Sequence, residues 1–243
     1  MPGKLSDKVA IVTGASSGIG RASALALAAE GAMVIVTARR QEKLDALVSE
    51  IKAMNSRAFA VAGDANDEAT AKKCVETALN EGGKIDILLN NTGMGNYKNL
   101  VDTSLEEYDL LMNTNMRTTF IFTREVVPQM LLQKQGTIIM MSSMAGLYGF
   151  ANQAVYCASK FSQVGFAQSL DKELRPGGIK VGVICPGGVK TEFAIGAGRT
   201  EASVAQSTML EATDVAEAVL LACTQAPGSR IIEIQMRTMS ESL

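Results

Sequence analysis

The chain of 243 residues contains no histidine and no tryptophan, and only 5% of its residues are aromatic. Without histidine the protein lacks the general base that most often works near neutral pH, which excludes Ser-His-Asp and Cys-His nucleophile pairs. Zinc or haem bound through histidine is excluded for the same reason. Any proton chemistry therefore uses a carboxylate, Lys, Tyr or Cys side chain whose pKa is tuned by its surroundings.

The sequence also has few cysteines, a small net charge and only short apolar runs. The four cysteines lie far apart and form no CxxC pair, which is typical of small buried side chains in a reducing compartment. A net charge of −2 gives no basic surface for nucleic acid. No apolar run approaches the ~20 residues that a membrane span needs, and the first residues lack the apolar core of a signal peptide. We expect a cytoplasmic protein with no metal site and no nucleic-acid or membrane partner.

The composition, 47% hydrophobic, is sufficient for a full core. Short β-branched runs alternate with longer runs of helical period along the whole chain. Strands are expected at residues 9–13, 33–37, 57–62, 85–90, 137–141, 181–185 and 231–234. This alternation predicts an α/β fold of the Rossmann type, a single doubly wound parallel sheet of about seven strands with helices on both faces. We expect one domain, 1–243, in which the least structured segment, residues 193–207, is either a mobile substrate lid or an ordinary surface loop.

The first expected strand is followed by a glycine-rich turn that opens a helix. Gly14, Gly18 and Gly20 have the spacing Gly-x-x-x-Gly-x-Gly. Glycines let a backbone turn tightly against a pyrophosphate, and a helix amino terminus offers free N–H groups and a positive dipole end. The turn therefore indicates a dinucleotide site, the alternative being ordinary turn chemistry.

The second expected strand is followed by Arg39 and Arg40, with no acid until Glu42. An NAD site usually has an acid about 20 residues beyond the glycines, where it binds the ribose 2′-hydroxyl. Arg39 can instead make paired hydrogen bonds to a 2′-phosphate, and Ser16 and Ser17 can add neutral donors. The alternative is that both arginines are solvated surface charges. The pattern favours NADP(H) over NAD(H).

Of the four tyrosines only Tyr156 has a lysine four residues on, Lys160, on the same face of an expected helix. A nearby ammonium group favours the phenolate and lowers the pKa of a tyrosine, so Tyr156 can exchange a proton with a carbonyl or alcohol oxygen. Ser143 ends the preceding strand and can hydrogen-bond that same oxygen. The alternative is a surface helix with an aromatic–lysine contact.

Taken together, these motifs resemble the classical short-chain dehydrogenase/reductase family over nearly the whole chain. The matching positions, in the family's order and spacing, are Thr13, Gly14, Gly18, Ile19, Gly20, Asp64, Asn90, Asn91, Gly93, Asn115, Ser143, Tyr156, Lys160, Pro186, Gly187 and Thr191. One departure is Thr92, where the family usually has alanine. Another is the carboxyl end, which lacks a Gly-Gly pair common in bacterial acyl-carrier-protein reductases.

The resemblance implies a role for each matching residue. Ser143, Tyr156 and Lys160 would form the catalytic triad, and Asn115 would support a water-linked proton relay to Lys160. The implied cofactor contacts are Gly14, Ser16, Ser17, Gly18, Ile19, Gly20, Arg39, Arg40, Asp64 and Ala65 (adenine), Asn91 and Gly93, Tyr156, Lys160, and Val189 and Thr191 (carboxamide). A homotetramer or homodimer is implied as well.

The resulting hypothesis is an NADP(H)-dependent oxidoreductase that interconverts a carbonyl and an alcohol, with Tyr156 as general acid/base. One alternative is reduction of a 3-oxoacyl thioester, and an alternative of another class is a non-catalytic dinucleotide-binding protein. The intact set of Ser143, Tyr156, Lys160 and Asn115 favours an enzyme. Residues next to the motifs are candidates for the substrate pocket: Gly95, Met144, Tyr148, Phe150 and Phe193.

Overall fold

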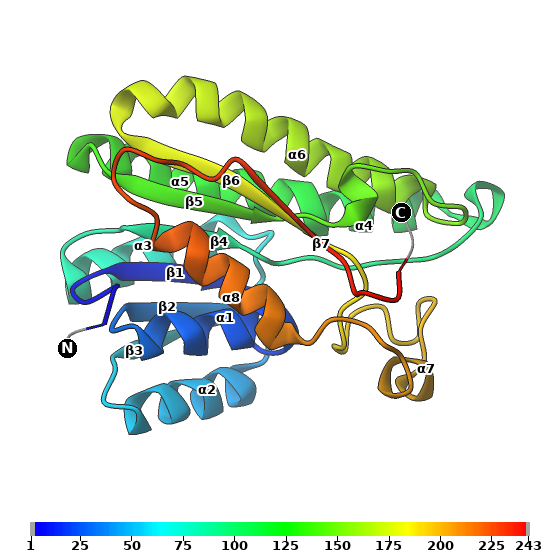
Figure 1. Ribbon diagram of the computed structural model, residues 1–243, viewed down its shortest axis with the longest axis horizontal. Coiled ribbons are helices and arrows are strands. Elements are labelled where there is room, and N and C mark those ends of the chain that lie inside the picture. The colour runs from blue at the N-terminus through cyan, green and yellow to red at the C-terminus, as the bar shows by residue number, and fades with distance from the viewer. Residues whose placement is uncertain (1–2, 242–243) are drawn as a thin grey trace.

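The computed structural model, which describes residues 3–241, contains a seven-stranded parallel sheet (Figure 1). The strands are β1 (Val9–Thr13), β2 (Met33–Ala38), β3 (Ala58–Ala62), β4 (Ile87–Asn90), β5 (Gly136–Met141), β6 (Ile179–Pro186) and β7 (Glu233–Met236). Their order is β3-β2-β1-β4-β5-β6-β7. The predicted fold class is confirmed.

Two layers of helices cover the sheet (Figure 1). One layer consists of α1 (Gly18–Ala29), α2 (Gln41–Ala53) and α8 (Ala212–Cys223). The other consists of α3 (Glu68–Gly82), α4 (Leu105–Met112), α5 (Thr118–Gln133) and α6 (Ala154–Leu174). Between α4 and α5 the backbone follows a π-helical turn, Asn113–Arg117. A short helix, α7 (Glu201–Ala205), lies apart from both layers.

The core sits on both faces of the sheet because each strand alternates between them. In β1, Val9 and Ile11 pack against the α3–α5–α6 layer, whereas Ala10 and Val12 pack against the α1–α2–α8 layer. All of β1 is buried, which explains why the strand is an unbroken apolar run rather than an alternating one.

The strand order reverses direction between β1 and β4, where consecutive connections cross to opposite faces. A crevice opens at the carboxyl ends of the strands at such a switch point. The residues that follow β1, β2, β4, β5 and β6 therefore meet at one edge of the sheet, and the fold brings the expected motifs together there.

Several expectations about chain organisation need correction. Observed strand ends differ from the expected ones by one or two residues: β3 begins at Ala58 and not at 57, β4 at Ile87 and not at 85, β5 at Gly136 and not at 137, and β6 runs over Ile179–Pro186 and not 181–185. The last strand begins at Glu233 and not at residue 231, because Val183 donates to the carbonyl of Ile232 and fixes the pairing with β6 two residues later. The 193–207 segment, expected to be the least structured, contains the short helix α7, whose Thr200 caps the helix by accepting from Ser203 N. Within residues 3–241 no helix is long and apolar enough to span a membrane.

Candidate active site

A cavity of about 790 Å³ lies at the carboxyl ends of the strands and collects most of the predicted site residues. Those that line it are Gly14, Ser16, Ser17, Gly18, Ile19, Arg39, Arg40, Asp64, Ala65, Asn91, Gly93, Ser143, Tyr156, Lys160, Val189 and Thr191. Gly20 and Asn115 do not line it. Of the candidate pocket residues, Tyr148 is outside the lining, and Gly95, Met144, Phe150 and Phe193 are part of it.

The glycine-rich loop has the conformation that its glycines permit. Gly14 and Gly18 adopt positive φ angles of 63° and 54°, a region that favours glycine. Gly20 is a packing residue, because a Cβ there would lie 2.4 Å from the carbonyl oxygen of Gly14. Asn91 donates from its amide to the carbonyls of Thr13 (3.0 Å) and Gly14 (3.3 Å) and so ties the loop to β4. These hydrogen bonds fix the position of the glycine-rich loop where α1 begins.

The amino terminus of α1 fits an anionic group. Ser17 precedes the helix without accepting a side-chain capping bond, and the first turn has no acidic residue. Its free N–H groups and positive dipole end face the cavity at Ser17, Gly18 and Ile19. This is the donor set that a dinucleotide pyrophosphate requires.

Arg39 and Arg40 both line the cavity but differ in their partners. Arg40 donates to the hydroxyls of Ser16 (2.9 Å) and Ser17 (3.0 Å) and to the carboxylate of Glu192 (2.9 Å). The exposed Arg39 forms no ion pair with any residue of 3–241. Arg39 is therefore the cation available to an added phosphate, while Arg40 organises the serine hydroxyls beside it.

The other predicted cofactor contacts are positioned by local backbone bonds. Asp64 accepts from the backbone N–H of Asn66 (2.9 Å), so its carboxylate closes a turn as well as facing the cavity. Thr191 accepts from the backbone N–H of Phe193, and its methyl group packs against Gly18. The backbone of Val189 pairs with that of Leu210 in a single parallel β-bridge outside the main sheet. These contacts place the segment after β6 against the glycine-rich loop.

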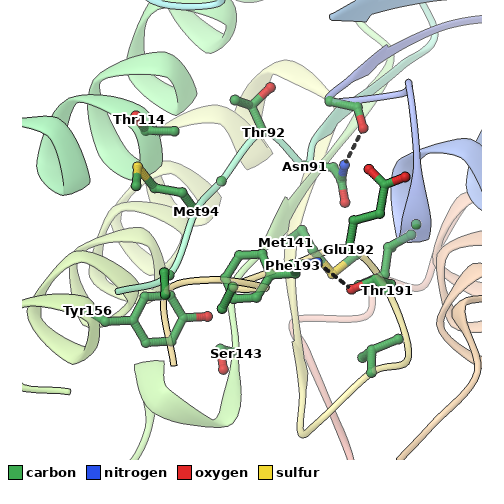
Figure 2. Close-up of a pocket in the computed structure, with 18 of the residues that line it drawn as sticks. Asn91, Thr92, Met94, Thr114, Met141, Ser143, Tyr156, Thr191, Glu192 and Phe193 are labelled. Carbon is green, nitrogen blue, oxygen red and sulfur yellow. Dashed lines mark hydrogen bonds between the residues drawn. The ribbon is translucent and has the colours of Figure 1, made fainter. Parts of the chain in front are cut away.

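Tyr156 lies at the other end of the cavity, with only 5% of its surface exposed. Its ring contacts those of Tyr97 and Phe193, with both centroid distances 5.9 Å. Figure 2 shows its hydroxyl close to Ser143 and the Phe193 ring beside it. Burial raises the pKa of Tyr156 above its ordinary value, while the Ser143 hydroxyl and the Arg199 charge partly oppose that rise.

Lys160 is 3% exposed, and its ammonium lies 6.0 Å from the Tyr156 ring centroid. Its Nζ donates to the carbonyl of Met141 (2.9 Å) and to Oε1 of Gln163 (2.9 Å). Burial lowers the pKa of Lys160 to about 8. The net direction for the Tyr156 pKa is upward, because desolvation of the phenol is its largest cause, and the Lys160 ammonium points toward Met141 and Gln163.

Asn115 is fully buried in the π-helical turn, behind the cavity wall. Its side chain accepts from Met94 N (2.7 Å) and donates to Met94 O (3.0 Å) and to Ser159 Oγ (2.8 Å). Asn115 therefore clamps the loop after β4 to α6.

The backbone carbonyl of Asn115 has two protein donors. Gln163 Nε2 donates to it at 2.9 Å and Thr119 Oγ1 at 2.9 Å. A carbonyl oxygen has two lone pairs, so both are taken. The side chain of Gln163 thus stands between Asn115 and Lys160, where the resemblance implies a water.

Gln163, Arg199 and Tyr97 are residues near the reacting centre that were not singled out from the sequence. Gln163 follows Tyr156 by seven positions and Lys160 by three, which places all three on one face of α6 and is a signal that was available. Arg199 lies in the 193–207 segment, and its position depends on how that segment folds back. No local pattern predicts it.

Comparison with known proteins assigns the family. Residues 8–202 match the short chain dehydrogenase family, which is well over half of the chain. The chain belongs to this family, and the predictions of family and of an oxidoreductase are confirmed. The family works with nicotinamide dinucleotides, in agreement with a cavity that begins at the α1 amino terminus and ends at Tyr156.

Three similar proteins show which activities and cofactors occur among the relatives of this chain. The chain is 37% identical over 188 residues to a 3-oxoacyl-[acyl-carrier-protein] reductase of Thermotoga maritima, covering 77% of this chain and 76% of that protein. A metagenomic short-chain oxidoreductase, solved in complex with NADP, is 34% identical with a TM-score of 0.84, covering 98% of this chain and 100% of that one. A 3-ketoacyl-(acyl-carrier-protein) reductase of Brucella melitensis, solved with NADH, is 30% identical with a TM-score of 0.87, covering 96% and 98%.

Proposed function

We propose that this enzyme reduces the carbonyl group of a small molecule to an alcohol with NADPH, and catalyses the reverse oxidation, using Tyr156 as the acid/base. The observation that carries the proposal is the single cavity that joins the free amino terminus of α1 to the hydroxyls of Tyr156 and Ser143. One end of it fits a dinucleotide pyrophosphate and the other fits a carbonyl oxygen.

When bound, the nicotinamide supplies the hydride that adds to the carbonyl carbon. Tyr156 donates its proton to the carbonyl oxygen, so the product is a neutral alcohol and Tyr156 is left as a phenolate. Ser143 orients the oxygen by hydrogen bonding. The Lys160 ammonium, held by Met141 and Gln163, stabilises the negative charge that develops on Tyr156 as the proton leaves.

A preference for NADP(H) is supported by Arg39, which faces the cavity without an acidic partner within 3–241. It is also supported by the relative solved with NADP, whereas the relative solved with NADH shows that both cofactors occur among similar proteins. The roles of the remaining contact residues, from Asp64 at the adenine end to Thr191 at the nicotinamide end, belong to the same proposal.

Reduction of a 3-oxoacyl thioester is the second candidate, and the identity to acyl-carrier-protein reductases favours it. The non-catalytic alternative is set aside, since the chain belongs to an oxidoreductase family. A homo-oligomer, a cytoplasmic location, a single-domain organisation and a lid function for residues 193–207 remain predictions. The four free thiols are consistent with a reducing compartment.

The test is the variant Tyr156→Phe, assayed by NADPH absorbance with a panel of ketones, 3-oxoesters and 3-oxoacyl thioesters. We expect turnover to be abolished, because the ring remains and only the proton donor is lost, while NADPH binding measured by fluorescence titration is largely kept. Full activity of this variant would refute the mechanism. A parent enzyme that reduces thioesters alone would establish the second candidate.

A further inference from the structure

The substrate end of the cavity contains one strong cation that the mechanism does not use. Arg199 is partly buried and lies in the 193–207 segment, which folds back over the site. Its guanidinium carbon lies 5.8 Å from the Tyr97 ring centroid and 5.9 Å from that of Phe193. One of its N–H groups donates to the carbonyl of Val189 at 3.3 Å.

The same two rings contact the catalytic tyrosine. Tyr97 and Phe193 each lie 5.9 Å from the Tyr156 ring, so Arg199 is separated from Tyr156 by one layer of aromatic side chains. The backbone N–H of Tyr97 donates to the carbonyl of Ala197 (3.1 Å), which fixes the two loops relative to each other. The Arg199 charge also acts to lower the pKa of Tyr156, against the larger effect of burial.

The acidic residues of the cavity have other partners. Glu192 binds Arg40 and Lys43, and Glu241 binds Arg237. Arg199 forms no ion pair with any residue in the described part of the chain, 3–241. A guanidinium has five N–H donors, of which the Val189 carbonyl takes one and the Tyr97 side chain takes another. The remaining donors are available to a ligand.

We propose that Arg199 binds a carboxylate carried by the carbonyl substrate, so that the enzyme acts on oxo acids and the corresponding hydroxy acids. This inference rests on the proposed function and names the substrate class of the same site. The aromatic rings of Tyr97 and Phe193 would cover the carbon chain between the reacting carbonyl and the carboxylate. A planar guanidinium suits this task because it pairs with a carboxylate through two parallel hydrogen bonds.

A purely structural role for Arg199, as an anchor of the 193–207 segment, makes a different prediction. Loss of an anchor would weaken the reduction of charged and neutral substrates alike. Loss of an anion-binding group weakens only the charged one. The ratio of kcat/KM for an acid over that for its methyl ester therefore separates the two roles, whatever the general effect of a substitution on the loop.

The experiment compares 2-oxo, 3-oxo, 4-oxo and 5-oxo acids with their methyl esters at saturating NADPH. The enzymes are the parent protein, Arg199→Met, which keeps the aliphatic stem, and Arg199→Lys, which keeps the charge. For at least one chain length we expect the parent to prefer the acid. In Arg199→Met the acid-to-ester ratio should fall by about 10- to 100-fold, with a smaller fall in Arg199→Lys. Thermal unfolding of each variant is recorded as a check on folding.

Several outcomes overturn the inference. One is a parent enzyme that prefers the ester in every pair, and another is an acid-to-ester ratio that Arg199→Met leaves unchanged. Acetoacetyl-CoA is included to test a second source of negative charge. If Arg199→Met lowers kcat/KM for this thioester and not for the free acids, Arg199 binds a carrier phosphate and the carboxylate is refuted. If the parent reduces esters well and acids poorly, the proposed function stands and only this inference falls, whereas no reduction of any substrate refutes both.

Discussion

Gln163 offers the sharpest test of how the buried side chains control proton transfer. It is fully buried on α6 and uses all its hydrogen-bonding groups: Oε1 accepts from Lys160, while Nε2 donates to the Asn115 carbonyl and to Thr119 Oγ1 (2.8 Å). The substitution Gln163→Met keeps the length and the apolar stem of the side chain and removes its donors and acceptor. The Lys160 ammonium is then left with the Met141 carbonyl as its hydrogen-bond acceptor.

The size of the effect follows from these contacts. A hydrogen bond to a charged group contributes about 1.5–3 kcal/mol, and a shift of one pKa unit corresponds to about 1.4 kcal/mol. Because Gln163 Oε1 stabilises the charged form of Lys160, its loss lowers a pKa that burial has already brought to about 8. We expect a further fall of about one to two units.

The assay is the pH profile of kcat for carbonyl reduction, recorded by NADPH absorbance across the neutral and alkaline range. Reduction needs the Lys160 ammonium beside Tyr156, so activity falls as pH rises through the Lys160 pKa. In Gln163→Met this alkaline limb should move to lower pH by the same one to two units. With no histidine in the chain, no imidazole titration overlaps the profile.

Thr119→Val is the matched control for this experiment. It removes one acceptor of Gln163 Nε2 and the hydroxyl bond to the Asn115 carbonyl, but it leaves the contact between Gln163 and Lys160 intact. We expect it to lower the free energy of unfolding by about 1–3 kcal/mol without moving the alkaline limb. The reasoning is refuted if folded Gln163→Met has its alkaline limb at the pH of the parent enzyme.

Two further predictions concern the cofactor end. Arg39→Ala should weaken NADPH binding by about 10- to 100-fold and NADH binding far less, because only NADPH carries the 2′-phosphate. The control for the change in net charge is Lys52→Ala, at the exposed end of α2. Equal binding of both cofactors to the parent enzyme would contradict the assignment of Arg39 to the 2′-phosphate. Thr13→Val should cost about 2–5 kcal/mol in chemical unfolding, because the Thr13 hydroxyl accepts from Asn91 N (2.9 Å) and Thr92 N (3.0 Å). Thr13→Ser keeps the hydroxyl and should therefore have a free energy of unfolding close to that of the parent enzyme.

The sequence predicts all seven strands, either with their observed bounds or, as for β4 and β6, displaced by up to two residues at an end. β1, for instance, is buried at all five positions and was placed with its observed bounds. The edge strand β7 was displaced, because it is only partly buried and its start depends on pairing with β6, a contact far away in sequence. The helix α7 was missed because it has five residues and a single buried side chain, Val204.

In the candidate site, too, residues of local motifs were easier to predict than residues placed by contacts distant in sequence. Residues fixed by a local motif, such as Gly14 and Gly18, could be placed at the cavity because strand and helix ends determine where they lie. Residues whose importance comes from a partner elsewhere were harder to predict. The position of Arg199 against Tyr97 depends on its loop folding back over the cavity, and no spacing within the sequence encodes that contact.

At neutral pH the site holds the protonation states that carbonyl reduction needs. It raises the pKa of Tyr156, so the phenol keeps its proton, and it lowers that of Lys160 only to about 8, so the ammonium remains the major form. Both groups are then in the state that carbonyl reduction needs, a proton donor beside a cation. Alcohol oxidation needs the Tyr156 phenolate as a base, a form that burial disfavours. A protein without histidine can thus hold a proton donor beside a cation at neutral pH, because the Tyr156 phenol keeps its proton and the Lys160 ammonium keeps its charge there.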